Sequence, residues 1–599
     1  LLAKLPLLLG LLKADPLLLY GGLQSGLRPG WLPGYPPYPT LDPNIAFTSH
    51  ALGRRAALEV FSGHLPWWNH FEGVGAPLAG EMQSAALFPL TWLLLLPHGQ
   101  LYMHLILQVI AGVATWALLR RLGCGQVAAV AAAMVFEFNG TFAWLANAVI
   151  NPIAFLPVVL LGVETARERV SEGRGGGLGL IAIGLAASLY AGFPEVAYLN
   201  GLLIAAWTLV RTATLPRPTW WPFLLRVGIG AVAGLAIAAP ILVAFLDYLP
   251  LASLGGHEGA AFGTLHLRPG YLLATLAPYA FSAPFHLKLY DDLWGSVGGY
   301  AGCMLLGLAV YGALGQRLRA LRVLLAAWVA VTVAFSYGLP GLDLLARVIP
   351  GIGSAAFYRY TPPGWEFSLC VLAGLGLSDL AAMRARWPLW AALAATVAAA
   401  AAAWLFSRSQ NLPLGHPLGL LNLAGLGLLL VAAVALIVFA KSQPKLARGL
   451  AARMVLEAVA YFVLPSLGWP SAGRVETGGV AYLRAHLGFQ RFATVGPLQP
   501  NYGSYFGLAA INHNDLPIPG AWTAYVSRHL DRDANPILFT GASSVDDLAA
   551  RFDAYRAVGV RYVLLSPGTL DTAGFQALKA ATLGPDAPFR PVYDDPAVQ

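Results

Sequence analysis

Charged residues are scarce in this chain: they make up 11% of its 599 residues, whereas 57% are hydrophobic. A soluble domain carries about 25% charged residues, so a chain of this length and composition could not cover a soluble surface. A lipid bilayer removes that requirement, because lipid tails accept apolar side chains. The shortage of charge therefore excludes an ordinary soluble protein and predicts an integral membrane protein.

Cysteine is also scarce. The three present, Cys124, Cys303 and Cys370, lie in or beside apolar segments without CxxC or histidine spacing, so we predict neither a disulfide nor a metal site from them. The sequence has no P-loop, HExxH or GxSxG motif, and no dinucleotide fingerprint in a suitable setting. The net charge of +8 lies in short loops, as is usual in membrane proteins, and indicates no nucleic-acid partner.

Apolar stretches are abundant. A transmembrane helix needs about 20 residues, within a range of about 17 to 25. On that criterion we predict a polytopic α-helical membrane protein with about 13 spans, at residues 3–23, 100–119, 127–148, 152–165, 178–191, 196–210, 227–247, 297–315, 322–338, 364–381, 387–406, 417–440 and 452–468. Residues 86–96 are apolar but too short to span, and fit a re-entrant or interfacial segment.

Basic residues alternate along the predicted loops. Every even-numbered span is followed by a basic loop, which contains Arg120 and Arg121, Arg167, Arg169 and Arg174, Arg211, Arg217 and Arg226, Arg317, Arg319 and Arg322, Arg384 and Arg386, or Lys441, Lys445, Arg448 and Arg453. The positive-inside rule then places the N-terminus in the cytoplasm. Residues 24–99 and everything after 469 are expected outside.

The chain changes character at about residue 474, where charged residues become ordinary and strand-like runs appear. FDAYRAVGVRYVLLSPG, which begins at Phe552, predicts a helix, a glycine turn and a buried strand. We therefore predict a membrane domain over residues 1–473 and an α/β domain outside the membrane over residues 474–599. We expect the second domain to be truncated.

The first loop, residues 24–99, is longer than a connection requires. Between residues 40 and 90 it mixes acidic residues, arginines and histidines with two adjacent tryptophans. Residues 44–61 have the apolar spacing of a helix. This is the chemically densest segment of the chain, so it is the first place to seek a site.

A resemblance to a known family rests on this loop. GHLPWWNHFEGVGAPLAGEMQSAALFPLTWLL, residues 63–94, resembles the signature of the bacterial YfhO-like membrane proteins. That signature is a G-x-P-x-W-N-x-x-x-x-G-x-P stretch, followed by a glutamine-containing run and F/Y-P, with an Asp upstream, as Asp42 is. AGFPEVAY (191–198), PGIGSAAFYRYTPP (350–363) and AVGVRYVLL (557–565) are further matches in the expected order, so the likeness covers nearly the whole chain.

The YfhO-like family is similar to the GT-C class of glycosyltransferases, multispan enzymes that take sugar from a polyprenyl-phosphate donor. The resemblance implies a catalytic acid in the first loop, and we expect Asp42 to be the base for the acceptor hydroxyl. The alternative is that Asp42 caps the helix that begins near Asn44. A carboxylate in a partly dehydrated pocket suits the base. No cofactor is implied with certainty, and a divalent metal is left open.

Three further residues are candidates for the site. Glu81 could bind the acceptor or a metal in catalysis, or be a solvated loop acid. Glu195 lies at an outer span end, where a carboxylate is costly unless the end is wet. Arg359, in FYRYTPP, is the leading ligand for the donor phosphate, because arginine forms paired charge-assisted bonds. The alternative is an interfacial arginine that reaches lipid headgroups.

A second outer cluster, PFHLKLYDDLWG, contains His286, Lys288 and Asp291. His286 and Lys288 could bind the donor phosphate and Asp291 could line the pocket, or the segment could be a plain exposed loop.

Trp67 and Trp68, beside Asn69, could stack on a sugar and line the acceptor pocket. They fit the aromatic belt at the membrane surface at least as well.

The predicted function is sugar transfer from a polyprenyl-phosphate donor to an envelope glycan, lipid or protein outside the bacterial cytoplasmic membrane. One rival is a transporter or lipid flippase, which intramembrane acids such as Glu137 would suit, although the sequence shows no repeated halves. The other is a non-catalytic scaffold of envelope assembly. The sequence does not reveal the sugar, the acceptor or the oligomeric state.

Overall fold

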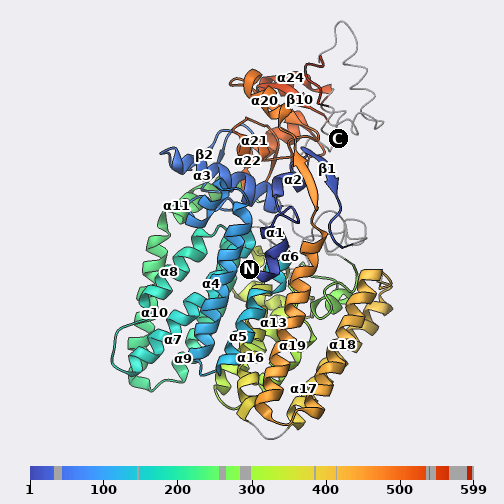
Figure 1. Cartoon of the computed structure of the whole chain (residues 1–599). Helices are drawn as coiled ribbons and strands as arrows, with labels where there is room; N and C mark the ends of the chain where they lie inside the picture. The colour runs from blue at the N-terminus through green and yellow to red at the C-terminus, as the bar shows by residue number, and fades with distance from the viewer. Residues whose placement is uncertain are drawn as a thin grey trace.

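The computed structural model describes most of the chain. The described residues are 1–32, 44–144, 148–254, 265–282, 299–382, 386–412, 414–534, 538–539, 548, 550–565 and 590–595. They form a long bundle of helices with a smaller unit stacked on one end (Figure 1). Of the predicted site residues, Asp42, His286, Lys288 and Asp291 lie outside the described part of the chain.

Ten helical segments in the described residues are long and apolar enough to cross a membrane. They are α4 (Gly99–Arg121), α5 (Gln126–Glu137) with α6 (Gly140–Trp144), η4 (Ala148–Phe155) with α7 (Leu156–Ser171), α9 (Pro194–Ala213), η5 (Arg217–Thr219) with α10 (Trp220–Ile237), α13 (Arg319–Ser336), α15 (Phe357–Tyr360) with α16 (Pro362–Ala382), α17 (Trp387–Ser409), α18 (Pro417–Phe439), and α19 (Gln443–Val463) with η10 (Leu464–Gly468). The protein is therefore a polytopic helical membrane protein, as its composition predicts.

Three shorter apolar helices complete the described bundle: α8 (Leu178–Tyr190), α11 (Ala239–Tyr248) with η6 (Leu249–Leu251), and α12 (Cys303–Ala313). Glycines bring some helices very close together. A Cβ placed on Gly312 of α12 would lie 1.9 Å from the carbonyl oxygen of Leu372 in α16. Such small-residue contacts are how membrane helices gain packing energy without a hydrophobic driving force between them.

The predicted first span, residues 3–23, is wrong. This segment forms η1 (Leu2–Lys4), α1 (Leu5–Leu8) and α2 (Pro16–Tyr20) instead of one helix. Gly10 has a positive φ of 68°, and the Asp15 side chain accepts a hydrogen bond from the Leu17 N–H, 2.9 Å away, as the cap of α2. A left-handed glycine and a capped new helix both end the helix before it.

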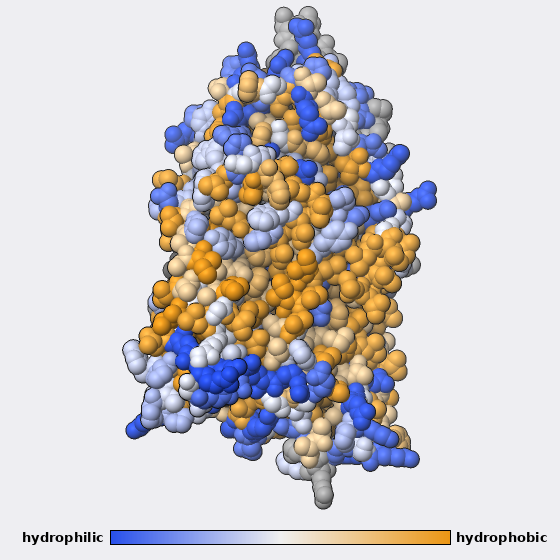
Figure 2. Space-filling view, turned by 60° about the vertical axis from the view of Figure 1, so that its left-hand side comes forward, coloured by the Kyte–Doolittle hydropathy of each residue, from blue (hydrophilic) through white to orange (hydrophobic). Residues whose placement is uncertain are grey.

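The arginine-rich loops gather at one end of the bundle, here named the basic end. Arg226 Nη1 donates to the Arg174 carbonyl oxygen at 2.8 Å, and Arg317 Nη1 donates to the Leu122 carbonyl oxygen at 2.9 Å, so loops distant in sequence meet there. Hydrophilic side chains form a band near this end, below a broad hydrophobic zone (Figure 2). This is the distribution expected of a membrane-spanning bundle.

The opposite end, the tail end, carries the described residues of the first loop and of the tail, the part of the chain that begins at residue 474 (Figure 1). In the first loop, the helix predicted over residues 44–61 is present as η2 and α3. The loop elements are β1 (Gln24–Arg28), η2 (Ile45–Leu52), α3 (Gly53–Phe61), β2 (Trp68–Asn69), β3 (Ala76–Pro77) and η3 (Pro89–Leu95). β2 pairs with β3 in an antiparallel hairpin.

The tail combines short strands with helices. Its predicted helix, glycine turn and strand are present as α24 (Phe552–Ala557), Gly559 with φ 85°, and β10 (Val560–Leu564), which pairs in parallel with β6 (Arg491–Thr494). β10 is only partly buried, however. The other tail elements are α20 (Gly478–His486), α21 (Tyr502–Phe506), β7 (His513–Asn514), β8 (Ile518–Pro519), α22 (Gly520–Tyr525), η11 (Val526–Leu530) and β9 (Leu538–Phe539).

Two strand pairs tie the tail to other parts of the chain. β5 (Ala472–Val475) is antiparallel to β1 of the first loop, and β8 is antiparallel to β4 (Ala252–Ser253), which follows α11. The remaining short elements, η8 (Pro269–Thr275), α14 (Asp343–Val348) and η9 (Ile352–Ser354), also lie between spans.

Candidate functional site

The first loop, residues 191–198 and residues 350–363 meet at the tail end. A Cβ placed on Gly192, in the segment 191–198, would lie 2.7 Å from the carbonyl oxygen of Met82 in the first loop. Gly192 also has a φ of 96°, a backbone conformation that glycine adopts at least cost. The Tyr198 hydroxyl donates to the carbonyl oxygen of Pro350, the first residue of the segment 350–363. Residues far apart in the sequence thus form one continuous structure.

Glu195 and Arg359, predicted separately, are brought together. Glu195 lies in the first turn of α9 and accepts a hydrogen bond from the Ala356 N–H. Arg359 lies on α15, close enough for its charge to act on the Glu195 carboxylate, and it also lies over the Tyr360 ring at 5.3 Å. A half-buried arginine beside a fixed carboxylate is a suitable group to hold a phosphate or a hydroxyl.

Glu81 is buried in a tight turn of the first loop, with 3% of its surface exposed. Its carboxylate accepts the backbone N–H groups of Ser84 at 2.7 Å and Gln83 at 2.8 Å. Burial raises the pKa of Glu81 to about 8, although hydrogen bonds from Ser84 and Gln83 oppose that rise. The group can therefore gain or lose a proton near neutral pH, which general acid–base chemistry requires.

Asn69 is buried as well, at the contact between the first loop and the tail. Its Nδ2 donates to Ser504 Oγ at 2.9 Å and to Glu72 Oε2 at 3.0 Å. The Glu72 carboxyl lies beside that of Asp515 in the tail, close enough for each to act on the pKa of the other. Burial raises the pKa of Glu72, and it raises that of Asp515 well above its usual range, with the charges of Glu72 and Glu81 adding to the effect.

Ser504 and Asp515 were not among the predicted site residues. The one available signal for Asp515 is its place in the polar run Asn512–Asp515, which stands between apolar Ile511 and Leu516. Polar residues in such a position are often buried with partners. The partner itself could not be inferred, because it lies in a distant segment.

Trp67 and Trp68 lie on the surface, with 41% and 47% of their area exposed. The Trp68 ring packs over Gly75 within the same hairpin, where an added Cβ would lie 2.8 Å from the ring. Neither indole is part of the buried Glu72–Asp515 contact. Among the described residues, no group of three or more His, Cys, Asp or Glu side chains is arranged to hold a metal ion.

The solved structures that are similar to this chain include crystal structures of ArnT from Cupriavidus metallidurans, one bound to undecaprenyl phosphate and one in the apo state. Sequence identity is 13% and 12%, and the TM-scores are 0.42 and 0.41. The matches cover 95% and 97% of this chain and 94% of each ArnT chain. A likeness at these scores carries no argument about activity. No family model and no curated protein matches the chain.

Proposed function

We propose that the protein is an integral-membrane glycosyltransferase of the GT-C type. It would take a sugar from a polyprenyl-phosphate donor and transfer it to an envelope acceptor outside the cytoplasmic membrane. The observation that supports this most strongly is the convergence of the first loop, residues 191–198 and residues 350–363 at the tail end. These are the segments on which the resemblance to the YfhO-like proteins rests.

The proposed reaction needs a base and a cation. The acceptor hydroxyl oxygen forms a bond to the anomeric carbon, the bond from that carbon to the phosphate oxygen breaks, and the hydroxyl proton passes to a carboxylate. Asp42 remains our candidate for that carboxylate. Its segment leads directly into η2, whose residues are all buried. Phosphate leaves as a stable anion, so no second acid is required; glycoside hydrolysis, in contrast, uses two carboxyl groups.

Arg359 is proposed to bind the departing phosphate, with Glu195 fixing α15 through the Ala356 N–H. A planar guanidinium can pair two of its N–H groups with two phosphate oxygens. Lys288 and His286 are proposed as additional phosphate ligands and Asp291 as a pocket residue, on the sequence alone. Trp67, Trp68 and Asn69 are proposed on the acceptor side, where the tail would position the acceptor.

Glu81 is proposed to act near the acceptor. Its two hydrogen bonds to backbone N–H groups fix the turn of residues 81–84, and its raised pKa keeps a proton within reach of neutral pH. A carboxyl group of this kind can exchange a proton with a hydroxyl group beside it.

The proposed orientation places the basic end in the cytoplasm of a bacterium, by the positive-inside rule. The first loop and the tail then face the outside, where lipid-linked sugars are used by enzymes of this class. The cytoplasmic position of the N-terminus stays a prediction, because the expected first span is broken.

The acids within the bundle give the transporter alternative little support. Glu366 of α16 is 1% exposed and accepts hydrogen bonds from the Thr141 hydroxyl, at 2.7 Å, and from the Tyr300 N–H, at 3.2 Å. Glu457 of α19 accepts the N–H groups of Cys303 and Met304 at the start of α12. Both carboxylates thus satisfy backbone groups where helices begin inside the bundle, a structural need in any membrane protein.

A donor-consumption assay tests the proposal. Purified full chain in nanodiscs is incubated with radiolabelled polyprenyl-phosphate sugars and a bacterial envelope fraction. We expect release of polyprenyl phosphate and transfer of label to the envelope fraction, both dependent on the protein. Intact donor after prolonged incubation with several hexose and pentose donors would contradict the proposal.

A further inference from the structure

A cavity within the bundle lies beneath the start of η2. Its walls are mostly apolar and come from the N-terminal segment, η2, α4, α6, η4 and the residue after η10. The lining residues are Lys4, Leu7, Ala14, Ile45, Gln100, Leu101, His104, Gln108, Phe142, Ile150 and Trp469. Because Ile45 begins η2, the cavity adjoins the part of the chain that follows Asp42.

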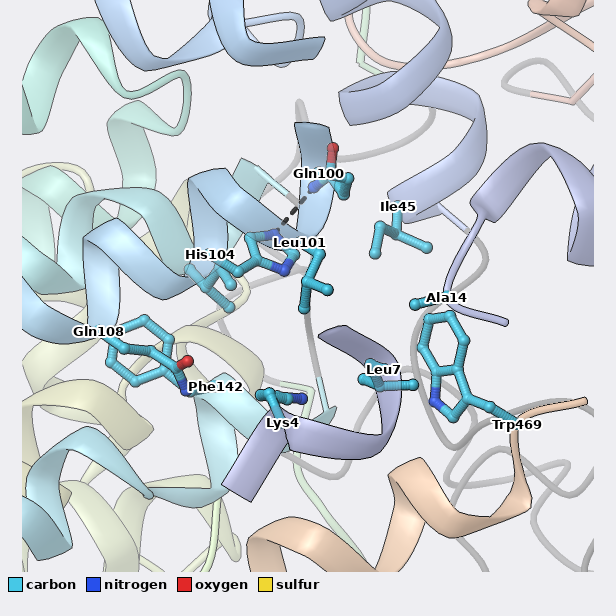
Figure 3. A pocket seen from close by; sticks show the side chains of 11 residues that line it. Lys4, Leu7, Ala14, Ile45, Gln100, Leu101, His104, Gln108, Phe142 and Trp469 are labelled. Carbon is cyan, nitrogen blue, oxygen red and sulfur yellow. Dashed lines mark hydrogen bonds between the residues drawn. The ribbon is translucent and has the colours of Figure 1, made fainter. Parts of the chain in front are cut away.

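The polar groups of the cavity come from one face of α4 and from Lys4. Gln100, His104 and Gln108 are spaced by four residues and so share a face of the helix. Figure 3 shows Gln100, His104 and Gln108 among the residues that line the cavity, together with Lys4 of the N-terminal segment. Polar residues within a span are costly in lipid and usually mark a site or a pathway. Here they are gathered on one wall of a cavity.

Two of these polar groups have unused bonding capacity. Gln100 and His104 pair through their Nε2 atoms at 2.8 Å, while the buried Gln100 Oε1 has no hydrogen-bond partner. An amide –NH₂ can only donate, so His104 Nε2 accepts and a neutral ring carries its proton on Nδ1. That N–H is then available as a donor. Gln108 Nε2 donates only a long bond of 3.3 Å, to the Glu137 carbonyl oxygen.

Lys4 provides the charge. Its ammonium lies 4.5 Å from the centre of the Phe462 ring, and among the described residues it has no ion pair with a carboxylate. Glu137, on the neighbouring helix, turns its carboxylate toward Gly112 instead, with Oε2 2.9 Å from a Cβ placed there. The Lys4 side chain is half-buried. A partly buried ammonium without a counter-ion is costly, and an anionic ligand would lower that cost.

The size of the cavity restricts the ligand. Its volume is about 30 Å³, room for roughly two or three water-sized groups. That accommodates the terminal oxygens of a phosphate but not a sugar ring. Leu7, Leu101 and Phe142 line the same space, so only the phosphate end of a lipid fits there and its chain would lie outside the cavity.

We propose that this cavity binds the phosphate end of a membrane lipid, with Lys4 as counter-ion and His104 and Gln108 as hydrogen-bond donors. The site is distinct from the Glu195–Arg359 contact. It does not depend on the proposed sugar transfer, because any lipid ending in a phosphate monoester carries the required chemistry.

Binding to the full chain in detergent tests this by native mass spectrometry. The probes are polyprenyl phosphate, phosphatidic acid, inorganic phosphate and uncharged polyprenol. We expect one lipid phosphate to bind and polyprenol to bind at least tenfold more weakly. Binding of polyprenyl phosphate alone would identify it as the source, and equal binding of phosphatidic acid would extend the site to bilayer lipids. Inorganic phosphate binding as tightly as the lipids would overturn the lipid assignment.

Variants locate the site. Lys4→Gln should weaken lipid-phosphate binding at least tenfold, and Lys4→Arg should retain most of it. His104→Leu, which leaves the charge in place, should weaken binding less. Lys13→Gln is the matched control, because Lys13 Nζ donates to the Gly10 carbonyl oxygen and does not line the cavity. Unchanged binding in both Lys4→Gln and His104→Leu would overturn the proposal. Sugar transfer is a separate readout, so its absence would refute the enzyme and leave this site intact.

Discussion

The carboxyl groups of Glu72 and Asp515 lie beside each other at the buried contact between the first loop and the tail. Two ionised carboxylates only accept hydrogen bonds and repel each other, so we expect the pair to hold a proton. Burial raises the pKa of both groups, which favours that proton. We therefore predict that a shared proton joins two distant segments at this contact.

The pH dependence of stability follows from these raised pKa values. A carboxyl group whose pKa is higher in the folded state binds more protons there, so stability is complete in acid and is lost as pH rises. For Glu81 the loss runs between its ordinary value of 4.5 and about 8. We expect the melting temperature in detergent to fall steadily from pH 5 to pH 9. A flat profile would show that these groups are not held protonated.

The variant Asp515→Asn distinguishes the contribution of the Glu72–Asp515 pair to this pH dependence from that of the other acids. The amide can donate to Glu72 without a shared proton, so we expect a shallower pH profile and a gain of about 1–3 kcal/mol at pH 9. Asp553→Asn is the control, because its side chain is fully exposed beside Arg556. Equal profiles for wild type and Asp515→Asn would contradict the shared proton.

A substitution of Gly192 tests the contact between the first loop and the turn that precedes α9. Gly192→Ala forces a side chain onto a backbone with φ 96° and within 2.7 Å of the Met82 carbonyl oxygen. We expect it to cost about 1–3 kcal/mol from backbone strain alone, measured as a lower melting temperature. Gly201→Ala, within α9 and facing open space, should be neutral or stabilising by up to about 1 kcal/mol. Equal effects of the two changes would argue against this contact.

The ion pair between Glu164 and Arg211 holds α7 against α9 near the basic end. Arg211 Nε and Nη2 donate to the two carboxylate oxygens at 2.6 and 2.7 Å, and both side chains are buried. Arg211→Met leaves a buried charge unpaired and should cost about 3–5 kcal/mol. The double variant Glu164→Leu/Arg211→Met should recover part of the loss, because it still leaves the buried Trp207 Nε1–H, which donates to Glu164 at 2.8 Å, without its acceptor. Arg169→Met, which breaks an exposed pair with Glu172, should change the melting temperature little. If the double variant were no more stable than Arg211→Met, the loss could not be attributed to the unpaired charge of Glu164.

Arg359 has a closely matched control for its proposed role. It lies over Tyr360 at 5.3 Å, as Arg408 lies over Trp404 at 5.2 Å. Arg359→Lys loses the planar fork and should lower kcat/KM for the polyprenyl-phosphate donor about tenfold or more, mainly through KM. Arg408→Lys should leave it unchanged. An equal response of the two variants would remove Arg359 from the donor site.

The helical architecture could be predicted because span length and apolar content follow from the bilayer itself. The helices α4, α17 and α18 lie within a few residues of their predicted ranges. The break in the first span could not be predicted from hydropathy, because Leu5 to Leu12 form a continuous apolar run. Hydropathy does not report the left-handed backbone of Gly10 or the helix cap formed by Asp15.

In the candidate site, too, the individual residues could be predicted from the sequence, but their contacts could not. Glu195 and Arg359 could be named from their segments, but their meeting depends on the packing of α9 against α15. The Glu72–Asp515 contact was missed, because a tertiary contact between distant segments leaves no local pattern. The structure leaves Asp42, His286, Lys288 and Asp291 as predictions from the sequence, since they lie outside the described residues.

The most direct test of sugar transfer compares Asp42→Asn with Asp247→Asn, an exposed carboxylate on α11. Release of polyprenyl phosphate from a radiolabelled sugar donor is measured for wild type and both variants, each checked by melting temperature. The account predicts that Asp247→Asn retains the wild-type rate and that Asp42→Asn loses about 100-fold to 10,000-fold, as expected for loss of a general base. Full release by a folded Asp42→Asn protein would contradict it.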